Sequence, residues 1–192
     1  MEQLVKIVII GDSGVGKSSM LLRFVENKYD DFFLPTIGLE FFIKKININN
    51  KIYKIHIWDL AGQDRFRSLV TSYYRNAQGI LLAFDLTNQD SFKNIEKWIS
   101  NIYKYGRNNV KIILVGTKSD LEQDIKVSAE QIEKFAQYIN VSYYEISAKN
   151  NSNIEESFED LVKQIQLNLD IEKDLNNKYV SLSSKKNTTC CK

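Results

Sequence analysis

The chain has 192 residues, of which 43% are hydrophobic and 26% charged, proportions that exclude a disordered or fibrous protein and fit one ordinary globular domain. The formal net charge of +2 divides into about −1 over residues 1–170 and about +3 over the residues that follow. The body is nearly neutral and the whole chain has only five arginines, so few cations are available to bind a phosphate backbone. This excludes nucleic acid as a partner.

Apolar runs bounded by turn residues predict six strands, and the segments between them predict five helices. In chain order we expect a strand at 5–10, a helix at 17–27, strands at 41–48 and 51–58, a helix at 68–74, a strand at 79–85, a helix at 91–105, a strand at 111–116, a helix at 128–138, a strand at 142–146 and a helix at 154–169. Asn49 and Asn50 predict a tight antiparallel hairpin at one edge. The rest alternates strand and helix, which indicates a doubly wound α/β fold with a mostly parallel six-stranded sheet flanked by about five helices.

The domain organisation that follows is one domain over residues 1–170 and a flexible tail over residues 171–192, where Asn, Ser, Thr and Lys replace the periodic pattern. The apolar run at residues 4–10 contains Lys6 and lacks a small-residue cleavage site, so it does not fit a signal peptide. Cys190 and Cys191 lie at the end of the tail, so no disulfide is expected across the core, which suits a reducing compartment. Polar loops beyond the carboxyl ends of the strands are where a ligand is expected.

A phosphate-binding loop lies between the first strand and the first helix, where the sequence fits GxxxxGK[ST]. Its glycines allow close approach to phosphates, successive N–H groups and the helix N-terminus face the anions, Lys17 reaches the outer phosphates, and Ser18 can bind Mg²⁺. The fold class is therefore that of a P-loop NTPase. The residues expected at the phosphates are Gly11, Asp12, Ser13, Gly14, Val15, Gly16, Lys17, Ser18 and Ser19.

Two further loops predict recognition of guanine. Thr117, Lys118 and Asp120 follow the fifth strand, and Ser147, Ala148 and Lys149 follow the sixth. The Asp120 carboxylate can accept from the ring N–H and the amine of guanine, whereas adenine offers it neither donor. Lys118 can cover the base plane, and the N–H of Ala148 can donate to the guanine carbonyl.

The segment after the third strand supplies groups for Mg²⁺ and water. Asp59 and Thr36 are expected to bind Mg²⁺ together with Ser18, the N–H of Gly62 faces the γ-phosphate, and Gln63 orients the attacking water. Gln63 and Lys17 are the predicted catalytic residues.

These motifs in this order resemble the Ras superfamily over residues 4–169, and the roles given above are carried over from it. Within that superfamily, the stretches IGLEF at 37–41, WDLAGQDRFR at 58–67 and YYRNA at 73–77 are similar to Rab sequences. The resemblance implies an effector-facing apolar patch and two aromatic residues near the nucleotide. The patch residues are Ile37, Phe41, Trp58 and Tyr73, and the aromatic residues are Tyr29 and Phe33.

Five positions depart from the Rab pattern. Thr117 stands where Asn is usual and bears on how the base loop is tied to the phosphate loop. Leu60, Asp64 and Asn76 replace Thr, Glu and Gly and bear on the geometry around Gln63, and Phe33 replaces a common Tyr. His56, the only histidine, is expected to be a sheet residue.

The ending Cys190-Cys191-Lys192 matches the CCX ending of Rabs, which implies geranylgeranylation of both cysteines and a stable membrane anchor. The resemblance implies a monomeric GDP/GTP switch that regulates vesicle trafficking on the cytoplasmic side of intracellular membranes and cycles with the cytosol. Its expected partners are effectors, an exchange factor, a GTPase-activating protein and a GDP-dissociation inhibitor. A nucleotide kinase and a non-hydrolysing nucleotide-binding scaffold remain the alternatives.

Overall fold

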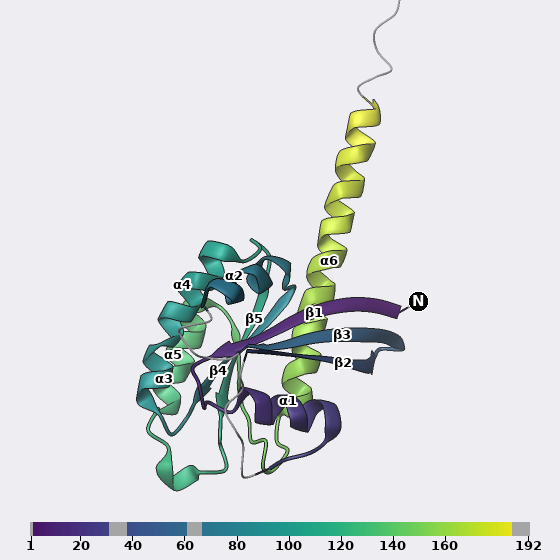
Figure 1. The fold of residues 1–192 in the computed structure, drawn as a ribbon. Helices are drawn as coiled ribbons and strands as arrows, with labels where there is room; N and C mark the ends of the chain where they lie inside the picture. The colour runs from purple at the N-terminus through teal and green to yellow at the C-terminus, as the bar shows by residue number, and fades with distance from the viewer. Residues whose placement is uncertain (1, 31–37, 61–66, 186–192) are drawn as a thin grey trace, which may run out of the picture.

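The computed structural model describes residues 2–30, 38–60 and 67–185, with the backbone alone described at 67–71 and 172–185. The described residues form a six-stranded sheet in the order β2-β3-β1-β4-β5-β6, with helices on both faces (Figure 1). Only β2 and β3 run antiparallel to each other, and the other neighbouring strands are parallel. The predicted α/β class and its single antiparallel pair are confirmed.

The strands lie close to the predicted runs. They are β1 (Glu2–Gly11), β2 (Leu39–Ile48), β3 (Lys51–Leu60), β4 (Gly79–Asp85), β5 (Lys111–Thr117) and β6 (Ser142–Glu145). Asn49 and Asn50 join β2 to β3 with φ values of 51° and 61°, the left-handed conformation that a two-residue type I′ hairpin turn requires. Asn tolerates this conformation better than most residues, so the pair fixes the register of the hairpin.

The helices are α1 (Lys17–Glu26), α2 (Arg67–Asn76), α3 (Gln89–Lys93), α4 (Ile95–Tyr105), α5 (Ala129–Ile139) and α6 (Ile154–Lys185), with a short 3₁₀ turn at Glu122–Asp124. The Ser128 hydroxyl accepts from the N–H of Gln131, and the Gln131 side chain accepts from the N–H of Ser128, forming a capping box that begins α5. Asn27 and Asn140 end α1 and α5 in the left-handed conformation.

Two helices differ from the sequence prediction. The helix predicted over 91–105 is two helices, α3 and α4, which meet at Asn94, a short polar residue that suits helix ends better than interiors. The helix predicted to end at Leu169 continues to Lys185, because the sequence between those residues contains neither Gly nor Pro to stop it. Residues 171–185, predicted to belong to a flexible tail, are therefore helical. Figure 1 shows this last part of α6 projecting away from the sheet.

The core has two layers, one on each face of the sheet. Side chains of β1 alternate between them, because successive residues of a strand point to opposite faces: Ile7 and Ile9 pack with α1 and α6, and Val8 and Ile10 pack with α2, α4 and α5. Both layers bury aromatic and branched side chains almost completely. Among the described helices, none is long and apolar enough to cross a bilayer. The loops after β1, β5 and β6 therefore start from a closely packed sheet.

Candidate functional site: a nucleotide pocket beyond the carboxyl ends of the strands

The phosphate loop turns sharply between β1 and α1, and its glycines are required by geometry. Gly14 and Gly16 have φ values of 77° and 90°, which L side chains rarely adopt. At Gly11, with φ of 145°, an added Cβ would lie 2.1 Å from the carbonyl oxygen of Ala83 on β4. The end of β1, where the phosphate loop begins, can therefore pair with Ala83 of β4 only with glycine at this position.

Lys17 begins α1 and lies along the inside of this loop. Its side chain is buried, and its Nζ donates to the carbonyl oxygens of Gly11 at 3.1 Å and Asp12 at 2.6 Å. Burial lowers the pKa of Lys17, while the charges of Asp59 and Asp12 oppose that shift. The ammonium group is thus held at the centre of the loop, where it can turn to an anion bound by the loop N–H groups.

Ser18 and Asp59 meet at the other side of Lys17. The Ser18 hydroxyl donates to Oδ2 of Asp59, whereas Oδ1 of Asp59 is buried without a hydrogen-bond partner in the part of the chain that the structure describes. Burial raises the pKa of Asp59 to about 6, against the lowering effects of the Ser18 hydrogen bond and the Lys17 charge. A buried carboxylate oxygen without a partner beside a hydroxyl fits a hard cation with oxygen ligands, so these residues suit Mg²⁺.

A pocket of about 280 Å³ lies next to the phosphate loop. Its walls come from α1, from the segments after β5 and β6, and from Tyr29. The lining residues are Gly16, Ser19, Met20, Tyr29, Thr117, Lys118, Asp120, Leu121, Ile146, Ala148 and Lys149. Apart from the glycines of the phosphate loop, seven of the residues predicted to bind the nucleotide line this pocket. They come from four separate stretches of sequence.

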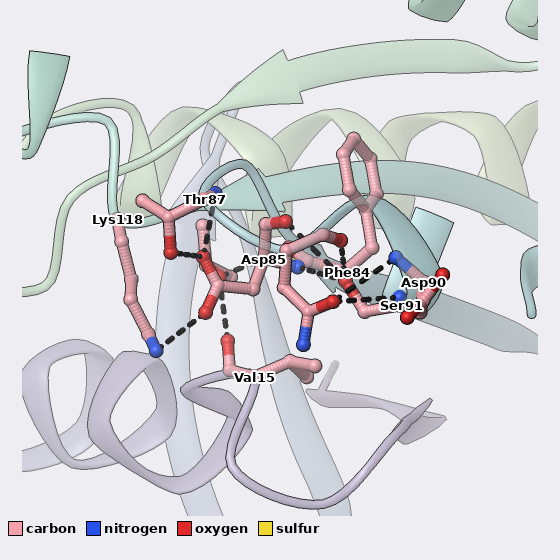
Figure 2. Close-up of polar contacts among 9 residues, drawn as sticks. Val15, Phe84, Asp85, Thr87, Asp90, Ser91 and Lys118 are labelled. Carbon is pink, nitrogen blue, oxygen red and sulfur yellow. Dashed lines mark hydrogen bonds and ion pairs between the residues drawn. The ribbon is translucent and has the colours of Figure 1, made fainter. Parts of the chain in front are cut away.

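Lys118 is held by a residue that the sequence reasoning did not single out. Its Nζ lies 2.5 Å from Oδ2 of Asp85, and Oδ1 of Asp85 accepts from the N–H of Thr87 at 2.8 Å and from its hydroxyl at 2.7 Å. Figure 2 shows the extended Lys118 side chain reaching the Asp85 carboxylate beside the Val15 carbonyl. Lys118 has a φ of 61°, so its backbone turns at the edge of the pocket while the ion pair fixes its stem.

Thr117 ties the base loop to the phosphate loop. Its buried hydroxyl lies 2.5 Å from the carbonyl oxygen of Val15 and 3.0 Å from that of Phe84. Thr117, which stands where Rabs usually have Asn, therefore still connects the two loops. Its hydroxyl offers one proton, whereas an Asn amide would offer two.

Asp120 is oriented from the loop after β6. The Ser147 hydroxyl donates to Oδ1 of Asp120 at 2.6 Å and accepts from the N–H of Asn150 at 3.0 Å. Arg23 on α1 donates to the carbonyl oxygen of Ala148 at 2.8 Å, which fixes the same loop from the other side. Asp120 lines the pocket, and the Ser147 hydroxyl occupies only Oδ1, so the carboxylate keeps acceptor capacity that a guanine amine and ring N–H can use.

Two other contacts were not foreseen. The indole N–H of Trp98 donates to Oδ1 of Asp12 at 2.8 Å, and the Asn94 amide donates to Oδ2 at 2.7 Å, so α4 holds the phosphate loop.

Leu60, a departure from the Rab pattern, is 4% exposed and packs in the core beside Val8. A buried apolar neighbourhood suits Leu at that position. The preceding residue, Asp59, still contacts Ser18.

An aromatic patch lies on β2, β3 and α2, away from the pocket. The rings of Phe41 and Trp58 lie 5.1 Å apart and those of Trp58 and Tyr73 lie 6.2 Å apart, measured between centroids. Phe41 is 46% exposed, so it is not a core residue. His56 joins the patch, since its ring lies 5.2 Å from that of Phe41 in an edge-on contact. The residue pattern could have indicated this, because positions 56 and 58 of β3 share one face.

Some predicted site residues lie outside the described residues and stay predictions. They are Phe33, Thr36, Gly62 and Gln63 near the nucleotide, Ile37 of the effector patch, and Cys190 and Cys191 in the tail. Asp64, one of the departures from the Rab pattern, lies there too.

Comparison with known proteins gives the family. Residues 6–167 match the Ras family. The chain is 45% identical over 184 residues to Ras-related protein Rab-1D of Dictyostelium discoideum. The aligned residues make up 95% of this chain and 90% of that protein. It is 44% identical over 172 residues to Ras-related protein SEC4 of Saccharomyces cerevisiae, and the alignment covers 90% of this chain and 80% of that protein. It is also 44% identical over 177 residues to GTP-binding protein ypt2 of Schizosaccharomyces pombe, and the alignment covers 92% of this chain and 88% of that protein. The chain belongs to the Ras family and is a Rab-type small GTPase, an enzyme that hydrolyses GTP.

Proposed function

We propose that this GTPase is a GDP/GTP switch that regulates vesicle trafficking on intracellular membranes. The observation that carries the proposal is the pocket of about 280 Å³ that begins at Gly16 of the phosphate loop and ends at Asp120, whose carboxylate is oriented by Ser147. A fixed carboxylate at the far end of such a pocket favours guanine over adenine, because bound adenine would cover this acceptor without offering it a donor. The relatives Ras-related protein Rab-1D and Ras-related protein SEC4 support a small GTPase of vesicle trafficking.

The residues around the phosphates have separate tasks in this proposal. The loop from Gly11 to Ser19 binds the phosphates through backbone N–H groups, and Lys17 stabilises the charge that develops on the outer phosphate oxygens. Ser18, Asp59 and Thr36 would hold Mg²⁺, which neutralises charge on the β- and γ-phosphates when bound. Gln63 orients the attacking water, and Tyr29 covers the base.

Hydrolysis by the chain alone is proposed to be slow. Transition-state charge on the γ-phosphate is commonly stabilised by an arginine. Among the residues that the structure describes, Arg23 is the arginine next to the pocket, and its guanidinium is engaged by the carbonyl oxygens of Ala148 and Asn27. An activating protein would therefore supply the arginine in trans. The aromatic patch with Phe41, Trp58 and Tyr73, together with Ile37, is proposed as the surface that effectors bind in the GTP state.

Anchoring and cycling form the last part of the proposal. Geranylgeranyl groups on Cys190 and Cys191 would hold the chain on the cytoplasmic side of a membrane, and a GDP-dissociation inhibitor would return the monomer to the cytosol. An exchange factor would load GTP. The body, residues 1–170, would carry the switch, and residues 171–192 would link it to the lipid.

The test is competitive binding of GTP, GDP and ATP to the full chain with Mg²⁺, repeated with Asp120→Ala. We expect tight binding of both guanine nucleotides, weak binding of ATP, and loss of the discrimination in the variant by a factor of at least about 100. Asp124→Ala is the matched control, because Asp124 is an exposed carboxylate on the same surface loop that does not line the pocket. Equal competition by ATP would refute the guanine switch and favour a nucleotide kinase or an ATPase.

A further inference from the structure

A second pocket, the basic pocket, lies at the opposite end of the sheet from the phosphate loop. It measures about 370 Å³ and is lined by Leu4, Lys6, Arg75, Asn76, Gln78 and Arg107. These residues come from the start of β1, the end of α2, the segment before β4 and the segment after α4. Since a strand rises about 3.3 Å per residue, Lys6 and Gly11 of β1 are about 16 Å apart along the strand, so the basic pocket is separate from the nucleotide site.

Three cations line the basic pocket and no carboxylate does. Several exposed lysines elsewhere on the described surface pair with nearby acids, as Lys45 does with Glu2 at 2.7 Å and Lys93 with Asp90 at 3.0 Å. Within the ranges that the structure describes, Lys6, Arg75 and Arg107 form no such ion pair. Like charges that line one hollow repel each other, and a bound anion removes that repulsion.

The neutral residues of the basic pocket add donors and fix its shape. The Oε1 atom of Gln78 accepts from the backbone N–H of Lys6 at 2.9 Å, so the amide NH₂ group is the part of the Gln78 side chain that remains to donate. The backbone N–H of Gln78 donates to the carbonyl oxygen of Lys6 on β1 at 2.9 Å, and its carbonyl oxygen accepts from the N–H of Lys111 on β5 at 3.0 Å. These hydrogen bonds make this wall of the pocket rigid. Asn76 adds a further side-chain amide to the lining.

This set of donors fits phosphate. Guanidinium groups bind phosphate oxygens in a planar, two-pronged geometry, and a lysine ammonium adds a compact charge. The volume lies within the range of about 300–1,000 Å³ that is typical of small-ligand pockets. We infer that the basic pocket binds an anion with more than one phosphate group, of the inositol phosphate type.

The basic pocket lies next to the base of the last helix. Gln78 and Arg107 also line a small neighbouring hollow with Ile165 and Leu169 of α6. Beyond these residues α6 projects away from the sheet (Figure 1). A soluble inositol phosphate and the headgroup of an anionic lipid share the chemistry that the pocket recognises, and the experiment has an arm for each.

The first arm is calorimetric titration of the full chain, loaded with GDP and Mg²⁺, with inositol trisphosphate. Excess GDP keeps the probe away from the phosphate loop. We expect binding that weakens on the order of tenfold in each of Arg75→Gln and Arg107→Gln and further in the double variant. The matched control is Lys134→Gln, an exposed cation on α5 outside the pocket, which should leave the affinity unchanged. Both arginines are exposed, so the variants should fold, and retained GDP checks that they do.

The second arm is sedimentation of the same proteins with phosphatidylcholine vesicles, with and without phosphatidylinositol bisphosphate. Binding that depends on this lipid and falls in the double variant identifies the headgroup as the ligand. Binding of the soluble probe without such vesicle binding identifies a free inositol phosphate. If neither probe binds, or if the double variant binds both as the wild type does, the inference is wrong. The lysines of the tail are the same in every variant, so they do not affect the comparison.

Discussion

The hydroxyl of Thr117 lies 2.5 Å from the carbonyl oxygen of Val15 in the phosphate loop and 3.0 Å from that of Phe84 at the end of β4. A hydroxyl carries one proton, so it donates to one of these carbonyls at a time. The buried Thr117 hydroxyl thus ties the start of the base loop to the phosphate loop or to β4.

Replacing that donor should loosen the nucleotide. We expect Thr117→Ala to leave a buried carbonyl without its partner, at a cost of about 1–3 kcal/mol, and to speed GDP release by roughly ten- to a hundredfold. Thr117→Asn, with two amide protons, should serve both carbonyls and release GDP no faster than the wild type. Release of a fluorescent GDP analogue measures both. Equal rates in the Ala variant and the wild type would show that the tie has no role.

The ion pair of Lys118 with Asp85 should position the base loop. Asp85→Ala removes the partner of Lys118 and the acceptor of Thr87, so we expect GDP affinity to fall on the order of tenfold or more. Asp90→Ala is the control, because Asp90 pairs with Lys93 on the exposed surface of α3 and touches neither residue. Equilibrium titration with GDP gives both affinities, and equal losses in the two variants would contradict the role of Asp85.

The phosphate loop offers a test with a built-in control. In Gly11→Ala the new methyl group would lie 2.1 Å from the backbone oxygen of Ala83, so the loop or β4 must shift, and we expect a loss of a few kcal/mol of unfolding free energy. In Gly14→Ala no atom lies within 4 Å of the new Cβ, and only the strain of φ 77°, about 1 kcal/mol, remains. Urea unfolding at fixed GDP and Mg²⁺ concentrations should rank the variants in that order.

His56 should make stability depend on pH. Burial lowers the pKa of His56 below its ordinary value of 6.5, with the charges of Lys54 and Lys6 as smaller causes. A lowered pKa means that the folded protein prefers the neutral ring, so stability is lost as pH falls from about 6.5 towards the lowered pKa. His56→Gln cannot titrate there. Urea unfolding should show a smaller loss of stability between about pH 7.5 and pH 5.5 in the variant, and identical losses would contradict the assignment.

Gln63 is predicted to act on water and not on nucleotide binding. Gln63→Leu should leave GDP and GTP affinities unchanged and should reduce hydrolysis, with and without an activating protein, because the attacking water is no longer oriented. Single-turnover hydrolysis in the presence and absence of cell extract measures this. Stimulated turnover at the wild-type rate would refute the role given to Gln63.

The sequence by itself determined the fold class and the location of the chemistry. Apolar runs of period two, helical segments between them and the Asn49-Asn50 turn are local properties, so they predict the sheet, the hairpin and the loops without knowledge of distant contacts. Gly11, Gly16 and Lys17 were recognisable for the same reason, since a phosphate loop is one continuous stretch.

Tertiary structure decided which separate stretches meet. The pairing of Asp85 with Lys118, of Asp12 with Trp98 and of Arg23 with Ala148 joins residues between 33 and 125 positions apart, and no local pattern encodes such distances. The extent of α6 was likewise missed, because the end of a helix without Gly or Pro depends on weak local preferences. The basic pocket arises only when β1, α2 and the end of α4 come together, since Lys6, Arg75 and Arg107 are unremarkable surface cations until folding places them around one hollow.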